Sequence, residues 1–159
     1  MVTPKKFNAL IVGDDSTNRA INKKYLGKNG FEIGVAKNGQ EAVEYFQVGY
    51  RFDLVLMDME MPVMDGLQAT GEIRALGVRS LIIGMSSTSS QVKIQEFVNA
   101  GLDAYYPKPM NMAKLAAIVG RAVIDELQQA ELLLMNWNGP LSSGSGRHRE
   151  IIDMSAVHL

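Results

Sequence analysis

The sequence of 159 residues contains no cysteine. Disulfides, thiolate metal centres, iron–sulfur clusters and a cysteine nucleophile are therefore excluded. Histidine is almost as scarce, since the only two are His148 and His158 near the C-terminus. A histidine-based zinc site, a Ser–His–Asp triad and a phosphohistidine in the core are excluded for the same reason.

An excess of charge of one sign and long apolar runs are also missing. Sixteen Lys and Arg face seventeen Asp and Glu, for a net charge of −1, so no overall field draws the chain to nucleic acid or to an anionic membrane. No apolar run approaches the ~20 residues of a membrane span, and Met1–Lys6 lacks the apolar stretch of a signal peptide. We expect a cytoplasmic protein, with the nucleus as a further location, that binds neither nucleic acid nor membrane.

The residues that are present have the composition of a globular domain, with 47% hydrophobic and 21% charged residues. Apolar runs of strand length alternate with segments of helical periodicity. The runs at 9–12, 54–57 and 81–83 are almost continuously apolar, which is typical of strands covered on both faces. The predicted strands are Phe7–Val12, Phe31–Ala36, Asp53–Met57, Ser80–Met85 and Ala104–Pro107.

Helical segments with capping residues follow each predicted strand. Ser16 or Thr17 is predicted to cap the first helix, which carries the apolar residues Ile21, Tyr25 and Leu26. Strict alternation of strands and helices implies a doubly wound α/β fold, a parallel sheet with helices on both faces. The ligand site of such a fold lies outside the carboxyl ends of the strands. The other helices are predicted to begin at Gly39, Asp65, Ser89 or Ser90, and Asn111.

The C-terminal part of the chain differs in composition. We expect the last helix to reach residue 135, so that one domain covers 1–135 and a flexible Gly- and Ser-rich linker and tail cover 136–159. Leu132–Met135 is apolar on every face of that helix. Together with Leu127 and Trp137, this surface could form a homodimer seam, pack on the domain or bind a partner helix.

Chemically reactive side chains gather where the predicted strands end. Two carboxylates held close together repel unless a cation joins them, and Mg²⁺ prefers such hard oxygen ligands. A lysine and a hydroxyl beside them complete a phosphoryl-binding pocket in which a free carboxylate is the nucleophile. The members are Asp14 and Asp15 after the first strand, Asp58 after the third, Ser86 at the fourth and Lys108 at the fifth.

Each of these residues also has a structural alternative. An Asp such as Asp58 often caps a helix or ends a turn, but Asp65 already serves the following helix, so we favour function. Asp14 is favoured for function because Ser16 and Thr17 offer other caps, whereas both interpretations of Asp15 stay open. Lys108 could be an ordinary surface lysine, and its bond to Pro109 could be cis.

The sequence resembles the response-regulator receiver domains of two-component phosphorelays over about residues 7–124. Three segments carry the resemblance in the family's order and spacing: Leu56–Gly66, Ile83–Ser87 and Gly101–Pro109. The resemblance implies a flavodoxin-like five-stranded sheet, in the order 2-1-3-4-5, with five helices. The glycine at Gly84 and the short chain are similar to the plant type-C response regulators, which implies cytokinin signalling.

The resemblance also implies a role for each matching residue. Asp58 would be the phosphoacceptor, and Lys108 and Ser86 would bind the phosphoryl group. Ser86 and Tyr105 would form the switch that responds to phosphorylation. The donor would be a histidine phosphotransfer protein or a sensor histidine kinase, docking beside Ile21 on the first helix.

The resemblance implies a Mg²⁺ site as well. Asp14, Asp58 and the backbone carbonyl of Glu60 would hold the ion, while the side chains of Glu60 and Thr88 would tune dephosphorylation. The phosphate would then be relayed or lost by hydrolysis, since no output domain is visible. Catalysis would be limited to phosphorylation and dephosphorylation of the protein's own aspartate, with at most a phosphohistidine-phosphatase-like activity and no separate small-molecule reaction.

One position departs from the family's pattern. Gly13 stands where the family has the first of two consecutive acids. Loss of an outer carboxylate at a metal typically costs about 10–100-fold in affinity or activity, and Asp15 could compensate in part through a water. A pseudo-receiver, which binds proteins without being phosphorylated, is therefore the alternative.

Two other classes of function fit less well. In an aspartyl-phosphate phosphatase of the haloacid dehalogenase type, suggested by Asp58-Met59-Glu60, the nucleophile strand comes first and its other acids follow, whereas Asp14 comes before Asp58. A nucleotide-binding protein is disfavoured because the sequence has no Gly-rich loop ending in Lys-Ser or Lys-Thr.

Overall fold

The computed structural model describes residues 6–136, so the predicted linker and tail lie outside the described residues apart from Asn136. Five parallel strands form one sheet in the order β2-β1-β3-β4-β5, as predicted. The strands are β1 (Asn8–Val12), β2 (Glu32–Ala36), β3 (Leu54–Asp58), β4 (Leu81–Ser86) and β5 (Ala104–Pro107). The helices are α1 (Ser16–Lys28), α2 (Gly39–Gln47), α3 (Gly66–Ala75), α4 (Gln91–Asn99) and α5 (Met112–Met135).

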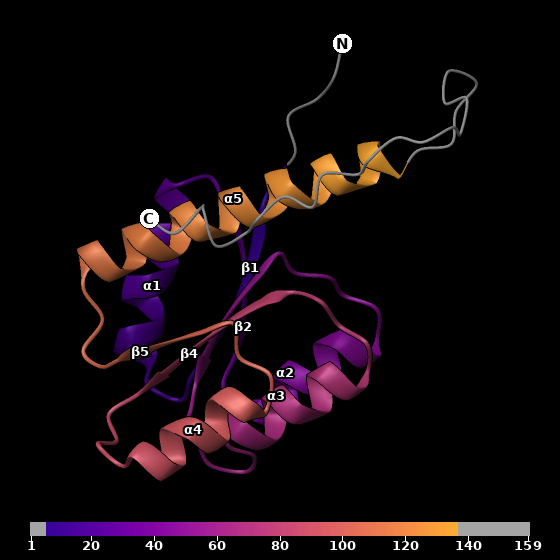
Figure 1. Ribbon diagram of the computed structural model, residues 1–159. Helices are drawn as coiled ribbons and strands as arrows, with labels where there is room; N and C mark the ends of the chain where they lie inside the picture. Colours follow the sequence, from indigo (N-terminus) through magenta and orange to yellow (C-terminus); the bar gives the residue numbers. More distant parts are fainter. Residues whose placement is uncertain (1–5, 137–159) are drawn as a thin grey trace.

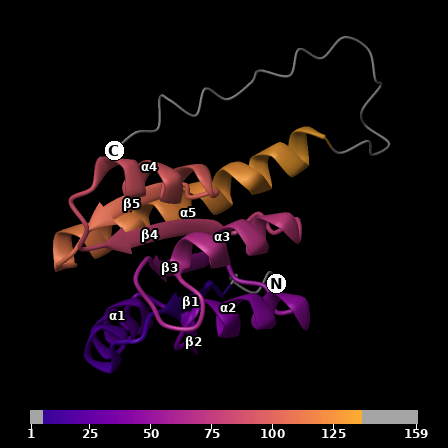
Figure 2. The same cartoon turned by 90° about the horizontal axis from the view of Figure 1, so that it is seen from below.

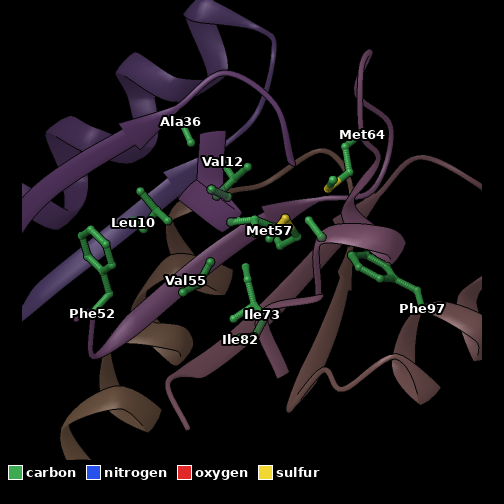
Figure 3. Packing of buried hydrophobic residues seen from close by; sticks show 13 residues of the cluster. Leu10, Val12, Ala36, Phe52, Val55, Met57, Met64, Ile73, Ile82 and Phe97 are labelled. Carbon is green, nitrogen blue, oxygen red and sulfur yellow. The ribbon is translucent and has the colours of Figure 1, made fainter. Parts of the chain in front are cut away.

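The helices cover both faces of the sheet. Figures 1 and 2 show α1 and α5 on one face and α2, α3 and α4 on the other. Side chains alternate between the faces of a strand, so Leu10 and Val12 of β1 pack toward α2 and α3 while Ala9 and Ile11 pack toward α1 and α5. Figure 3 shows the first of these two cores, in which the central strands meet Phe97 from α4.

The start of α1 differs from the prediction. Asp15, not Ser16 or Thr17, is the N-cap, and its Oδ1 accepts hydrogen bonds from the backbone N–H groups of Thr17 (2.8 Å) and Asn18 (3.3 Å). All three residue types cap helices well. The extended backbone of Asp15, with ψ of 112°, places its carboxylate over the first turn, whereas Ser16 already belongs to the helix.

Helix α1 turns a narrow face toward the core. Asn22 and Leu26, four positions apart, are its buried residues. Ile21 is 53% exposed, because it lies about 100° around the helix from Asn22. Tyr25 is half-buried and packs against the core.

Helix α5 extends to Met135, as predicted, and its last turns project past the sheet in Figure 1. Leu132, Leu133 and Leu134 are 44%, 73% and 75% exposed. These leucines therefore do not pack on the described part of the domain, and a homodimer seam stays a prediction. Among residues 6–136, no helix is both long enough and apolar enough to cross a membrane.

Gly84 in β4 fixes how closely α4 approaches the sheet. A Cβ at this position would lie 2.7 Å from Cε2 of Phe97 and would also collide with Leu102. Overpacking of a core typically costs about 1–3 kcal/mol, so Gly84→Ala should lower the free energy of unfolding by that amount. Urea denaturation measures this change in the free energy of unfolding. Gly71→Ala is the matched control, since a Cβ there meets nothing within 4 Å and should stabilise α3 by about 1 kcal/mol. Equal stability of the two variants would contradict this account.

Candidate functional site

The carboxyl ends of the central strands bring together residues that are far apart in the sequence. Strand register places Asp58 of β3 opposite Met85 of β4, and Ser86 opposite Pro107 of β5. Asp58, Ser86 and Lys108 therefore meet at one edge of the sheet, as the topology predicts.

Asp58 and Lys108 form the centre of this site. Nζ of Lys108 lies 2.7 Å from Oδ2 of Asp58, and the backbone N–H of Glu60 donates to Oδ1 at 3.2 Å. Asp58 is only 4% exposed, and this burial raises the pKa of its carboxyl while Lys108 counteracts the shift. Lys108 is thus no ordinary surface lysine. Its peptide bond to Pro109 is cis.

The Glu60 side chain lies beside this pair. Its Oε2 accepts a hydrogen bond from the hydroxyl of Ser86 at 2.7 Å. Its Oε1 accepts from the backbone N–H of Ser87 at 3.0 Å and from the Ser87 hydroxyl at 3.1 Å. Partial burial alone would raise the pKa of Glu60, but these hydrogen bonds outweigh it and hold the pKa below its usual value.

Ser86 is fully buried and connects the site to β5. Its hydroxyl oxygen accepts a hydrogen bond from the backbone N–H of Thr88 at 3.0 Å. Its carbonyl accepts from the hydroxyl of Tyr105 at 3.3 Å. The ring of Tyr105 is half-buried and packs edge-on against Phe97, with 6.5 Å between the ring centroids. A displacement of Ser86 would therefore change the packing between α4 and β5. The Thr88 hydroxyl oxygen accepts from the N–H of Ser90, the cap of α4, at 3.2 Å.

The loop after β1 contributes Gly13, Asp14 and Asp15. Asp15 is committed to capping α1, which favours the structural one of its two interpretations, and Asp14 is exposed and takes no part in that cap. A Cβ on Gly13 would lie 3.6 Å from Oδ2 of Asp58, so this glycine borders the central carboxylate directly. The guanidinium of Arg19 donates to the carbonyl of Gly13 at 2.6 Å.

These residues offer Mg²⁺ a sparse set of ligands. Asp14, Asp58 and the backbone carbonyl of Glu60 supply hard oxygens of the kind the ion prefers, and Mg²⁺ usually keeps several waters. Within the part of the chain that the structure describes, no three acidic, histidine or cysteine side chains gather as a metal centre. The chemistry of these oxygen donors fits Mg²⁺. Gly13 leaves the site without the carboxylate that the family's pattern has at this position.

A groove opens from the site toward α1. Its volume is about 450 Å³. Asn18, Ile21 and Asn22 of α1 line one part of it, and Asp58 and Lys108 lie in it as well. Exposure of Ile21 thus provides an apolar contact beside the candidate nucleophile, where the sequence predicts docking of a phosphodonor.

Two contacts escaped prediction from the sequence. Nothing in the sequence indicates that the guanidinium of Arg19 binds the Gly13 carbonyl. The side chain of Glu60 reaches Ser86 across 26 positions, and no local pattern specifies which way a loop carboxylate turns.

Comparison with known proteins gives a consistent result. The family model of the response regulator receiver domain matches residues 9–120. Two-component response regulator 24 of Arabidopsis thaliana is 40% identical over 114 residues, which cover 72% of this chain and 82% of that protein. Two-component response regulator ORR41 of Oryza sativa subsp. japonica is 36% identical over 120 residues, covering 74% of this chain and 94% of that protein.

Solved structures agree with this relationship. One is the receiver domain of the sensor histidine kinase PA1611 of Pseudomonas aeruginosa, with a magnesium ion coordinated in its active site cleft (TM-score 0.68, 31% identity, 75% of this chain and 98% of that one). Another is the receiver domain of Ssk1 crystallised with the histidine phosphotransfer protein Ypd1 of Saccharomyces cerevisiae (TM-score 0.65, 31% identity, 70% of this chain and 85% of that one).

Proposed function

Because the chain belongs to the response regulator receiver domain family of two-component signalling, we propose that it accepts a phosphoryl group from a phosphohistidine of a partner protein onto Asp58. The observation that carries this proposal is the ion pair of a buried carboxylate, Asp58, with Lys108 at the carboxyl edge of the sheet. A carboxylate with a fixed cation at 2.7 Å, open to a groove, suits a nucleophile that must hold added negative charge.

The reaction needs few groups. An oxygen of the Asp58 carboxylate attacks the phosphorus of the phosphohistidine, and the new P–O bond forms as the P–N bond breaks. The imidazole nitrogen keeps the electron pair of the broken bond. Lys108 already contacts Asp58 and can donate a hydrogen bond to one phosphoryl oxygen. The hydroxyl of Ser86 can donate to another. Asp14, Asp58 and the Glu60 carbonyl would hold Mg²⁺, which would neutralise charge on the transferring oxygens.

The response to phosphorylation would begin at Ser86. Movement of its hydroxyl toward the phosphoryl group shifts the carbonyl that Tyr105 contacts. Tyr105 packs on Phe97 of α4, so this local event changes the packing of α4 against β5. Thr88 and the Glu60 side chain would flank the path of an attacking water and would set the lifetime of the acyl phosphate.

The partner would be a histidine phosphotransfer protein or a sensor histidine kinase. The likeness to the Ssk1 receiver domain, which was crystallised with Ypd1, and the groove beside Ile21 support this proposal. After transfer the phosphate is relayed onward or hydrolysed. The similarity to short plant response regulators supports a place in plant hormone signalling of the cytokinin type.

A second candidate function is a pseudo-receiver that binds a partner protein without being phosphorylated. Gly13 favours this candidate, because it supplies no carboxylate beside Asp58. In the described part of the chain, no group of three metal-binding side chains gathers at the site. The ion pair of Asp58 with Lys108 and the hydroxyl of Ser86 beside it argue for the first candidate.

Phosphoryl transfer from a radiolabelled histidine phosphotransfer protein tests the proposal. We expect the donor to lose its label with Mg²⁺ and to keep it with a chelator, because Mg²⁺ lowers the cost of bringing two anions together. Label on the chain would indicate a relay, and label only in free phosphate would indicate a phosphatase-like sink. A donor that keeps its label in Mg²⁺, together with no reaction of a small phosphodonor, would favour the pseudo-receiver.

A further inference from the structure

The Glu60 carboxylate occupies hydrogen-bond donors at the edge of the site. It accepts from the hydroxyl of Ser86 at 2.7 Å and from the backbone N–H of Ser87 at 3.0 Å. A serine hydroxyl carries a single proton and can donate it to only one acceptor at a time. In the structure, Ser86 therefore has no proton left for a phosphoryl oxygen on Asp58.

We propose that Glu60 is an internal competitor of the phosphoryl group: its carboxylate holds Ser86 in the resting position and must release it before Asp58 can carry a phosphoryl group. This inference rests on the proposed function and specifies how the same site is restrained. We call the contact of Glu60 with Ser86 and Ser87 the latch.

The position of Glu60 strengthens the competition. Its backbone N–H donates to Oδ1 of Asp58 at 3.2 Å, so the two residues are neighbours at the tip of β3. The positive charge of Lys108 acts on both carboxylates. A phosphoryl group on Asp58 adds negative charge next to Glu60 and needs the hydroxyl of Ser86, which Glu60 already holds. Phosphorylation and the latch therefore exclude each other.

The latch predicts a gain of function when Glu60 is removed. Hydrogen bonds to a charged group are among the stronger ones in proteins, and breaking this one before phosphorylation should slow the reaction. Glu60→Ala should therefore accept a phosphoryl group about tenfold faster than the natural chain. Glu60→Gln keeps an oxygen acceptor without the charge and should lie between the two.

The experiment uses the full chain with Mg²⁺ and phosphoramidate, a small donor that needs no docked protein. Intact mass spectrometry follows phosphorylation of the natural chain, both Glu60 variants and Glu96→Gln, a matched loss of charge on an exposed residue of α4. The same Glu60→Ala change is then made in a Ser86→Ala background. The latch predicts acceleration only where the Ser86 hydroxyl is present, whereas simple charge repulsion by Glu60 would accelerate both backgrounds.

Hydrogen exchange of the Ser87 amide, measured by NMR without metal, gives a second result that does not depend on activity. Ser87 is exposed, so its amide should owe its protection to Glu60 and should exchange faster in Glu60→Ala. Equal phosphorylation rates of the natural chain and Glu60→Ala, or equal exchange of Ser87, would overturn the latch alone. Phosphorylation of no variant would overturn the proposed function and the latch with it.

Discussion

Replacement of Asp58 by asparagine should abolish acceptance of a phosphoryl group. The two side chains have nearly the same size, so the closely packed end of β3 can accommodate the change. An amide is neutral and its oxygen is a poor nucleophile, so the attack on phosphorus is lost. Lys108 also loses the carboxylate that holds it at 2.7 Å. We expect transfer to fall to the background of the donor's own hydrolysis.

The measurement is retention of label on a histidine phosphotransfer protein incubated with each chain. Asp125→Asn is the matched control, because it makes the same chemical change in a half-buried aspartate of α5, outside the groove. Far-ultraviolet circular dichroism shows whether both variants fold. Label transfer to a folded Asp58→Asn chain at the natural rate would place the acceptor elsewhere and would refute our assignment.

Replacement of Gly13 by aspartate should have the opposite effect, because it should strengthen the Mg²⁺ site. A Cβ at Gly13 would lie 3.6 Å from Oδ2 and 3.7 Å from Cβ of Asp58, which is ordinary contact, and the backbone there is not in the left-handed region that favours glycine. A carboxylate at this position would stand beside Asp14 and Asp58. Because an outer carboxylate at a metal is typically worth about 10–100-fold in affinity, Gly13→Asp should tighten Mg²⁺ binding by that factor.

Calorimetric titration with Mg²⁺ measures this affinity directly. Gly13→Asn, equal in size but neutral, is the control for a steric effect. The added anion should also lower the thermal stability of the metal-free chain, because carboxylates held close repel one another, and Mg²⁺ should restore it by binding the folded state. Equal Mg²⁺ affinity of the aspartate variant and the natural chain would show that Gly13 does not weaken the metal site.

The parts of the fold that could be predicted are those written in local patterns. The apolar run at 54–57 specifies a buried central strand, and the polar residue directly after it, Asp58, then falls at the carboxyl edge. The cap of α1 could not be predicted because Asp15, Ser16 and Thr17 are equally good candidates by residue type. Backbone geometry selects Asp15, and that selection changes what the aspartate is free to do.

Contacts made by long side chains between loops form the other part that the sequence did not reveal. The position of Glu60, two residues after Asp58, suggests a role near the phosphate, but its hydrogen bonds to Ser86 and Ser87 depend on how the β3 and β4 loops meet. The burial of Asn22 follows from the rotation of α1 about its axis, which periodicity alone specifies only to about one residue. In both cases tertiary packing decides the outcome.

The central place of β3 bears on how long a signal can be stored. β3 pairs with β1 on one side and β4 on the other, and all five of its residues are buried. Segments of this kind usually open only when the whole domain does, whereas helix ends and rim loops fray far more often. A phosphoryl group on Asp58 would thus be attached to a strand that seldom opens locally. The rate of dephosphorylation would be set by the chemistry of hydrolysis and by partner proteins, and not by local unfolding of β3.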